Sequence, residues 1–295
     1  MQPDITAVCA EIRYQYRQRN YAMEQRKRAD LALGSFLRLM LGWSLNADKE
    51  TNDAARDRAA ELIAIGEGVA KKGAAPGEDA ADFIEWRDVI AASIEARKPF
   101  DKIEAVTTKR MEELARQLPV WVEWGADVRG FGARSLAVIV GEAGDLSNYP
   151  KKGHLWKRMG LAVIDGVRQG GLAKTAGAEA WIEHGYNRER RSRMFVIGDT
   201  LVKGGDEYRA VYLARKEYER SRATAAGLIV APAAKIPAKR KDEFISDGHI
   251  HRMAQRYMEK RLLRDLWQAW NRGKASRVMP SVAGRSLPTH EPVAA

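Results

Sequence analysis

The sequence predicts an all-α protein in which an N-terminal helical bundle or coiled-coil hairpin is followed by a helical domain containing a helix-hairpin-helix. Through most of the first 120 residues, apolar residues recur at three- and four-residue intervals, the period of an amphipathic helix. No convincing alternation with a period of two occurs there, which argues against strands. After Trp121 the pattern changes to short helical stretches separated by glycines.

The N-terminal region divides into helices at its prolines and glycines. A helix rich in Arg and Tyr and then apolar is expected first, and we interpret its Arg/Tyr part as one face of a packed helix. Pro99 is expected to open a helix, and Pro119 to end it. The expected helices cover residues 5–45, 48–69, 79–96 and 99–118, with a break at Lys71–Gly77.

The C-terminal region is expected to end in one long helix. A loop rich in Ala and Pro at 223–237 and a basic run at 239–241 precede it, and Ser246 or Asp247 caps its start. From Gly273 the sequence loses its period, and we expect a disordered tail. The predicted organisation is therefore a helical region over residues 1–98, a second domain over 99–272 and a tail over 273–295.

Composition narrows the class of protein. The only cysteine is Cys9, so neither an intrachain disulfide nor a cysteine metal site can form. No segment approaches the length of apolar chain that a membrane span needs, and no signal peptide is recognised. We expect a soluble, cytoplasmic, nucleoid-associated protein that does not enter membranes.

Net charge differs sharply between the two halves. Residues 1–150 carry 21 Lys/Arg and 24 Asp/Glu, whereas residues 151–295 carry 29 and 15, so nets of −3 and +14 make up the formal +11. A domain that binds a polyanion shows this asymmetry, because phosphates are contacted by local cations. A solvated basic surface without a ligand remains the alternative.

A short motif heads the basic half. In Gly130-Phe131-Gly132 an apolar residue lies between two glycines, and a helical apolar pattern follows. The glycines permit a tight hairpin, Phe131 can fill the core, and the next helix begins with free amides. Such amides, together with the positive end of the helix, can hold a phosphate without reading sequence.

The order of the following elements resembles the C-terminal domain of the insertion-sequence 110/116/902 transposases. Gly130–Asp145 reads GFGARSLAVIVGEAGD, Tyr149-Pro150 follows, and Met159-Gly160-Leu161-Ala162 comes next. Gly185–Arg191 is similar to the basic helix start of that family, with Tyr186 as an insertion, and residues 253–270 look like its closing helix. The resemblance covers about residues 100–272.

The resemblance implies a DNA-binding module that contacts the phosphate backbone. The hairpin amides would grip a phosphate, and basic side chains would extend the surface. The partner expected is DNA, possibly also structured RNA, and we expect a homo-oligomer formed through the N-terminal helices. The candidate binding residues are Gly130, Phe131, Gly132, Arg134, Lys151, Lys152, Lys157, Arg158, Arg188, Arg190, Arg191 and Arg193.

The family's chemistry is not recognisable in this chain. No acidic strand motif of its catalytic domain occurs in residues 1–100, and the serine expected before a Gly-Gly pair is replaced by Arg168-Gln169 ahead of Gly170-Gly171. We therefore predict a DNA-binding protein without strand-transfer activity, no catalytic residues, no cofactor and no metal site. His249 and His251 would diverge on a helix. The alternatives are an active transposase whose catalytic groups are unrecognised or supplied in trans, and an adaptor that self-associates.

Overall fold

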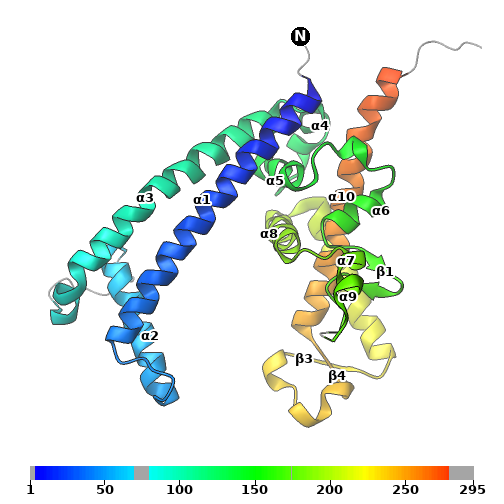
Figure 1. Cartoon of the computed structure of the whole chain (residues 1–295). Coiled ribbons are helices and arrows are strands. Elements are labelled where there is room, and N and C mark those ends of the chain that lie inside the picture. The colour runs from blue at the N-terminus through cyan, green and yellow to red at the C-terminus, as the bar shows by residue number, and fades with distance from the viewer. Residues whose placement is uncertain (1–3, 70–79, 174, 279–295) are drawn as a thin grey trace, which may run out of the picture. The chain divides into compact units, whose positions relative to one another are not determined.

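The computed structural model describes residues 4–69, 80–173 and 175–278, with side chains as far as Arg272 (Figure 1). Its regular structure is almost entirely helical, which confirms the predicted all-α class. The chain forms two compact units. Glu11–Glu112 make up the N-terminal unit, and the described residues on either side of that range make up the C-terminal unit.

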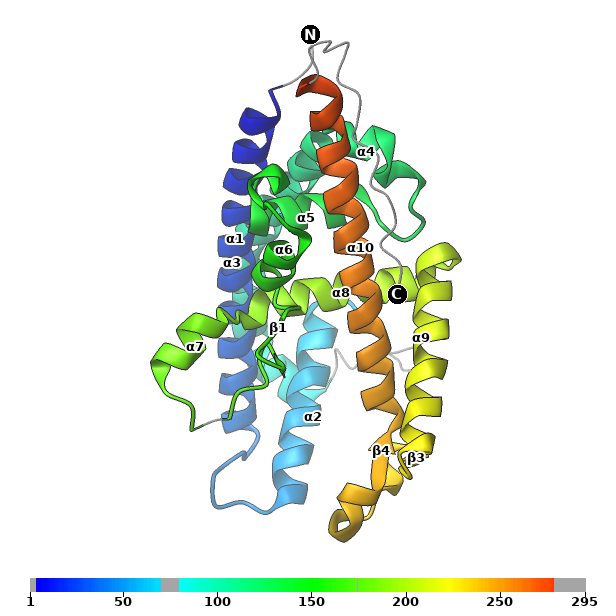
Figure 2. The ribbon, with the colours of Figure 1, turned by 90° about the vertical axis from the view of Figure 1, so that its right-hand side faces the viewer.

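The N-terminal unit contains α2 (Lys49–Gly66) and most of α1 (Ile5–Met40) and of α3 (Ala81–Arg116). Figures 1 and 2 show α1 and α3 running side by side, with α2 at the end where α1 stops. All three helices contribute to one apolar cluster at this end, because each has its buried residues at helical spacing. The cluster is formed by Leu33, Leu37, Ala59, Leu62, Phe83 and Ile90.

Glycines end the first two helices earlier than predicted. Gly42 has φ of +90°, and the amide of Trp43 donates to the carbonyl of Arg38 at 2.9 Å. Gly68 repeats this arrangement after α2, where the amide of Val69 donates to the carbonyl of Ala64 at 2.9 Å. Both are Schellman caps, so the predictions of 5–45 and 48–69 were too long at their C-terminal ends. The predicted break at Lys71–Gly77 lies outside the described residues.

Pro99 lies inside α3, so the prediction that it opens a separate helix is wrong. A proline in a helix loses one backbone hydrogen bond, here to the carbonyl of Glu95. Packing on both sides keeps the helix continuous, since Ile90 and Met111 are each 1% exposed. Pro119 does not end this helix directly but lies at the start of the short α4 (Pro119–Glu123).

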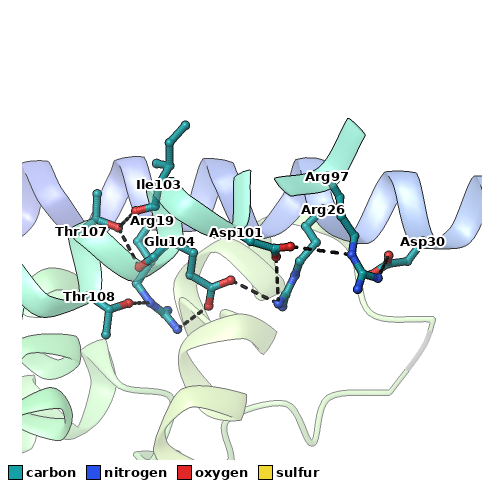
Figure 3. A network of polar contacts seen from close by, with 9 residues as sticks. All are labelled: Arg19, Arg26, Asp30, Arg97, Asp101, Ile103, Glu104, Thr107 and Thr108. Carbon is teal, nitrogen blue, oxygen red and sulfur yellow. Dashed lines mark hydrogen bonds and ion pairs between the residues drawn. The ribbon is translucent and has the colours of Figure 1, made fainter. Parts of the chain in front are cut away.

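Ion pairs connect α1 to α3 along the N-terminal unit (Figure 3). Nη2 of Arg19 lies 3.1 Å from Oε1 of Glu104, and Nη1 of Arg97 lies 2.9 Å from Oδ1 of Asp30. Arg26 reaches both Asp101 and Glu104 at 3.7 and 3.5 Å. Each arginine therefore meets a carboxylate on the neighbouring helix. Of the Arg/Tyr part of α1, Arg19 belongs to this packed face, whereas Arg13, Tyr14 and Arg17 are exposed.

The C-terminal unit is arranged around its last helix, α10 (Asp247–Val278). Helices α4, α6, α8 and α9 all contact it, and α9 runs beside it in Figure 2. Its apolar positions Ile250, Met258, Leu262 and Leu266 are fully buried. The other helices are η1 (Gly125–Asp127), α5 (Ala133–Ala143), η2 (Leu146–Asn148), α6 (Lys152–Arg158), α7 (Ala178–His184), α8 (Arg188–Gly204) and α9 (Asp206–Ala225).

Two small strand pairs complete this unit. β1 (Val163–Ile164) pairs antiparallel with β2 (Val167–Arg168). The predicted loop at 223–237 contains the end of α9, β3 (Ile229–Ala231) and η3 (Ala233–Lys235). β3 pairs in parallel with β4 (Phe244–Ser246), which follows η4 (Ala238–Glu243). Pairing between distant segments is not visible as local periodicity, which is why the sequence indicated only a loop.

The start of α10 agrees with the predicted cap, but its end does not agree with the predicted tail. The amide of His249 donates to Oγ of Ser246 at 3.1 Å. Helix α10 continues through Val278, so the expected loss of structure from Gly273 is wrong for residues 273–278. This stretch includes Lys, Ala and Arg, which extend helices well. The rest of the predicted tail lies outside the described residues. None of the described helices is both long enough and apolar enough to cross a membrane.

Candidate nucleic-acid interface

The hairpin between η1 and α5 depends on close backbone contact. Gly130 has φ of +84°, and a Cβ built on it would lie 2.9 Å from the carbonyl oxygen of Thr200 in α8. A Cβ on Gly204 would lie 2.9 Å from Cα of Gly130. Phe131 is 2% exposed and packs against Trp124 with ring centroids 5.5 Å apart. Gly130 therefore joins the hairpin to the C-terminal end of α8, and Phe131 anchors it on Trp124.

Gly132 is different, because its position is open. It is the N-cap residue of α5 with φ of −77°, it provides no side-chain cap, and a Cβ built there meets nothing within 4 Å. The position of Gly132 at the start of α5 is thus open to a larger side chain or to a ligand. Arg134 in the first turn is exposed.

The surroundings of the hairpin are acidic. A shallow pocket beside it is lined by Trp124, Arg129 and Tyr208 together with four carboxylates. Nη1 of Arg129 lies 3.8 Å from Oδ2 of Asp206, so its charge is partly balanced. Carboxylates repel phosphate, and the hairpin by itself is therefore a poor polyanion site. The four acidic residues are Glu123, Asp127, Asp206 and Glu207.

The predicted lysines lie around α6. Lys151, Lys152 and Lys157 are all exposed. Nζ of Lys152 lies 5.8 Å from the ring centroid of Trp156, and Nζ of Lys260 from α10 lies 5.2 Å from it. The indole Nε1 of Trp156 donates to the carbonyl of Lys260 at 3.0 Å, which fixes the ring against α10.

Two of the predicted arginines hold the C-terminal end of α5. Arg158 donates through Nε and Nη2 to the carbonyl of Glu142 at 2.9 and 2.7 Å. Arg190 donates through Nε to Oε2 of the same residue at 3.0 Å. Both guanidinium groups therefore satisfy groups at a helix end, a role in the fold that their position in a basic run did not indicate.

The remaining predicted arginines begin α8. Arg188 is exposed at the first helical position, and the side chain of Asn187 caps the helix by accepting from the amide of Arg190 at 2.9 Å. Nη1 of Arg191 lies 2.9 Å from Oε2 of the fully buried Glu259. Arg193 is half-buried. Of this group, Arg188 is the arginine that points to solvent.

The hairpin and the arginines lie at opposite ends of α8. The hairpin packs on Thr200 and Gly204, whereas Arg188 begins the helix. Twelve residues of α-helix correspond to about 18 Å. The structure therefore separates the predicted binding residues into two groups that cannot contact the same phosphate.

Gln169, one of the two residues at the expected nucleophile position, is buried and builds the corner between β2 and α7. Its Oε1 accepts from the amide of Ala162 at 2.9 Å, and its Nε2 donates to the carbonyls of Lys157 and His184 at 3.0 and 2.7 Å. It thus joins three segments of the chain. Arg168 next to it is exposed.

The two histidines have different surroundings. The Tyr212 hydroxyl and Nδ1 of His251 lie 2.8 Å apart, and burial followed by Lys216 lowers the pKa of His251. His249 is exposed. Among the described residues no group of three His, Cys, Asp or Glu side chains is arranged to hold a metal ion.

Four basic residues that the sequence analysis did not assign to the binding surface lie on α10 and β2. Arg252, Arg256 and Lys260 follow each other at four-residue intervals on α10, and Arg168 ends β2. Burial followed by Arg256 lowers the pKa of Lys260. In the sequence, the three residues on α10 can be recognised as like charges at i, i+4 and i+8, a spacing that places them on one face of a helix.

Comparisons with known proteins found no match. No family model, no curated protein and no solved structure matches it. The resemblance drawn from the ordered motifs therefore stays a prediction.

Proposed function

We propose that this protein binds nucleic acid, with duplex DNA as the ligand, through the phosphate backbone and without strand transfer. The observation that carries the proposal is a group of exposed cations that lack partners. No ion pair or side-chain hydrogen bond joins any of them to another described residue. They are Lys151 and Lys157 around α6, Arg168 of β2, Arg188 of α8 and Arg252 of α10.

Unpaired cations on adjoining elements favour a polyanion over a small ligand. Isolated surface charges contribute little to stability, so fold alone does not account for them. Backbone phosphates neutralise such a surface and release counterions, which makes binding strong at low salt. The contacts come from Lys and Arg and not from a helix placed against base edges, so binding is expected to be weakly sequence-specific.

The hairpin contributes less than the motif suggested. The space beside Gly132 at the start of α5 is open, but the four carboxylates beside the hairpin weaken any phosphate site there. We infer that residues around α6 and at the start of α8 make the main contact with the nucleic acid. The hairpin then serves to hold α5 against α8. Arg168-Gln169 at the expected nucleophile position supports binding without cleavage.

The test is fluorescence anisotropy with a mixed-sequence DNA duplex at several salt concentrations. The triple variant Lys151→Gln, Lys157→Gln, Arg188→Gln removes three exposed charges without breaking a described contact. Each lost phosphate contact should reduce the slope of log K against log salt by about 0.9, so we expect a slope smaller by about two to three and at least tenfold weaker binding at low salt.

The control removes the same charge elsewhere. Arg209, Lys235 and Lys239 are exposed on α9, η3 and η4, and changing all three to Gln should leave the slope unchanged. Arg190 and Arg191 are unsuitable targets, because their loss would disturb Glu142 and Glu259. Equal slopes for the wild-type chain and the first variant would rule out the proposed surface. If the chain binds duplex RNA more tightly than duplex DNA, RNA would take the place of DNA as the proposed ligand.

A further inference from the structure

Aromatic rings and cations alternate along the part of α10 that lies between α6 and α9. Both of these helices contact α10. Nζ of Lys260 on α10 lies 5.2 Å from the ring centroid of Trp156 on α6, and Nζ of Lys152 lies 5.8 Å from it. Tyr257 precedes Lys260 by three residues, a spacing that makes the two side chains neighbours on one face of the helix.

The row of side chains continues from Tyr257 to α9. Cζ of Arg215 lies 4.6 Å from the ring centroid of Tyr257 and 4.7 Å from that of Tyr218. One guanidinium group therefore lies against two tyrosine rings, a contact that combines cation–π attraction with the stacking of flat groups. We call Trp156, Tyr257 and Tyr218, together with Lys260 and Arg215, the aromatic band.

The buried Glu219 fixes the α9 end of the aromatic band. Its side chain is 3% exposed, and its Oε1 accepts from Nε of Arg215 at 2.8 Å. Nη2 of Arg222 lies 2.7 Å from its Oε2. The carboxylate thus orients Arg215 and balances its charge, so this guanidinium group offers a flat surface more than a free cation.

The two tyrosines keep a large part of their surface in water. Tyr218 is 54% exposed and Tyr257 is 43% exposed, and neither hydroxyl bonds to another described residue. Single exposed apolar side chains are common and need no explanation. Two exposed rings joined by a fixed guanidinium group are different, because they form a preorganised surface that loses little side-chain entropy when a flat ligand stacks on it.

The α6 end of the aromatic band has unbalanced positive charge. Lys152 is exposed, and neither Lys152 nor Lys260 has an ion pair with another described residue. Lys152 also follows Lys151, one of the cations proposed to contact the phosphate backbone. Flat aromatic groups beside unpaired cations suit single-stranded nucleic acid, because its bases stack on the rings while its phosphates meet the cations.

We propose that the aromatic band stacks unpaired bases of a nucleic acid, so that the preferred ligand has a single-stranded segment next to a duplex. The preference for such a junction rests on the proposed function, whereas the stacking of bases on Tyr218 and Tyr257 does not. Every base has a flat face, so binding to the aromatic band tolerates changes of sequence.

The experiment compares two single strands of equal length and charge by fluorescence anisotropy with the full chain at one salt concentration. One strand is oligothymidylate, and the other is an abasic strand that has the same phosphates but no bases. A base stacked on an aromatic ring strengthens binding by about fivefold or more, so we expect oligothymidylate to bind at least about fivefold more tightly than the abasic strand.

Tyr218→Leu and Tyr257→Leu each remove one ring and no charge. Each should weaken the binding of oligothymidylate by about fivefold or more and leave the binding of the abasic strand unchanged. Tyr218→Phe and Tyr257→Phe keep the ring and should bind both strands as the wild-type chain does. Urea titrations check the fold of each variant. If a Leu variant is unstable, crosslinking of the wild-type chain to a strand with iododeoxyuridine replaces it, and the crosslinked peptides should include Tyr218 or Tyr257.

Tyr14→Leu is the matched control, because Tyr14 is a tyrosine of the N-terminal unit that is 59% exposed on α1. This variant should bind both strands as the wild-type chain does. Equal affinity of the wild-type chain for the two strands would overturn the aromatic band as a stacking site. An effect of Tyr14→Leu as large as that of Tyr218→Leu would overturn it too.

Titrations with a plain duplex, and with the same duplex carrying a single-stranded extension, separate this inference from the proposed function. Tighter binding of the extended duplex supports both. If the chain binds the plain duplex but does not distinguish oligothymidylate from the abasic strand, the aromatic band is overturned and the proposed function stands. If it prefers oligothymidylate and does not bind the plain duplex, the aromatic band stands and duplex DNA is overturned as the ligand.

Discussion

Arg97 in the N-terminal unit and the exposed cations around α6 and α8 in the C-terminal unit differ in how their charge is balanced. In the N-terminal unit Arg97 lies within ion-pair distance of Asp30, Glu67 and Asp101, so one guanidinium joins three carboxylates. In the C-terminal unit the exposed Lys151, Lys157 and Arg188 have no ion pair with another described residue. Balanced charge fixes the long helices against each other, whereas these unbalanced cations are the ones that the proposed ligand would contact.

The substitution with the largest expected effect on stability is in the hairpin. It tests whether the C-terminal unit is held together by close backbone contact and not by charge. Gly130→Ala adds a Cβ 2.9 Å from the carbonyl oxygen of Thr200 at a residue with φ of +84°. Strain and overpacking together should lower the free energy of unfolding by about 4 kcal/mol. Gly132→Ala two residues later has open space and an ordinary φ, and urea titration should find it nearly as stable as the wild-type chain. Equal loss in both would contradict this explanation.

The second substitution tests what the buried carboxyl group of Glu259 contributes to stability. Burial raises the pKa of Glu259 from 4.5 to about 7 in the folded chain. Its ionisation therefore lowers the free energy of unfolding as pH rises from about 4.5 to about 7, and the whole loss persists at higher pH. Glu259→Gln should therefore raise the free energy of unfolding by about 3 kcal/mol at pH 8 and by little at pH 4.5.

Urea titrations at these two pH values check this prediction. Glu217→Gln, on the exposed side of α9, is the control and should show no pH-dependent difference from the wild-type chain. A Glu259→Gln chain that is less stable than wild type at pH 8 would mean that Glu259 stabilises its arginines more than its burial costs.

A smaller effect is expected for the balanced arginine. Arg97→Met leaves three carboxylates without their shared cation, and its side chain is 23% exposed, so we expect a loss of about 1–2 kcal/mol. Thermal unfolding with circular dichroism measures this loss. High salt should reduce the difference, because screening weakens repulsion among the carboxylates. An Arg97→Met chain that is as stable as the wild-type chain would show that balanced charge does not hold the N-terminal helices together.

The smallest effect concerns Arg26, which lies on the same helix pair with longer contacts of 3.5 and 3.7 Å and a side chain that is 35% exposed. Arg26→Gln should change the free energy of unfolding by no more than about 0.5 kcal/mol. Finding a loss as large as that of Arg97→Met would show that the number of carboxylates per arginine does not determine the effect.

The sequence predicted the helices because their apolar periodicity is local. It misplaced helix ends where glycine caps acted, and it missed β3 and β4 because their pairing is not local. It also grouped Arg158, Arg190 and Arg191 with Lys151 and Arg188 as one basic surface. Linear charge does not show which guanidinium groups turn inwards to Glu142 and Glu259, since that depends on how α5, α8 and α10 pack.

Several expectations stay predictions. Self-association through the N-terminal helices, DNA as the ligand and the likeness to transposases each need an experiment on the chain itself. The salt dependence of DNA binding addresses the second directly. Light scattering of the full chain addresses the first, and a monomer would contradict it.

Gln169 limits how this sequence can evolve. Its side-chain amide bonds three backbone groups, those of Ala162, Lys157 and His184. A serine at this position would be too short to reach all three, so a hydroxyl nucleophile could not be introduced here by one substitution without leaving buried polar groups unpaired. Any lineage that acquired this glutamine would need compensating changes around Ala162 and His184 before a serine became neutral at position 169.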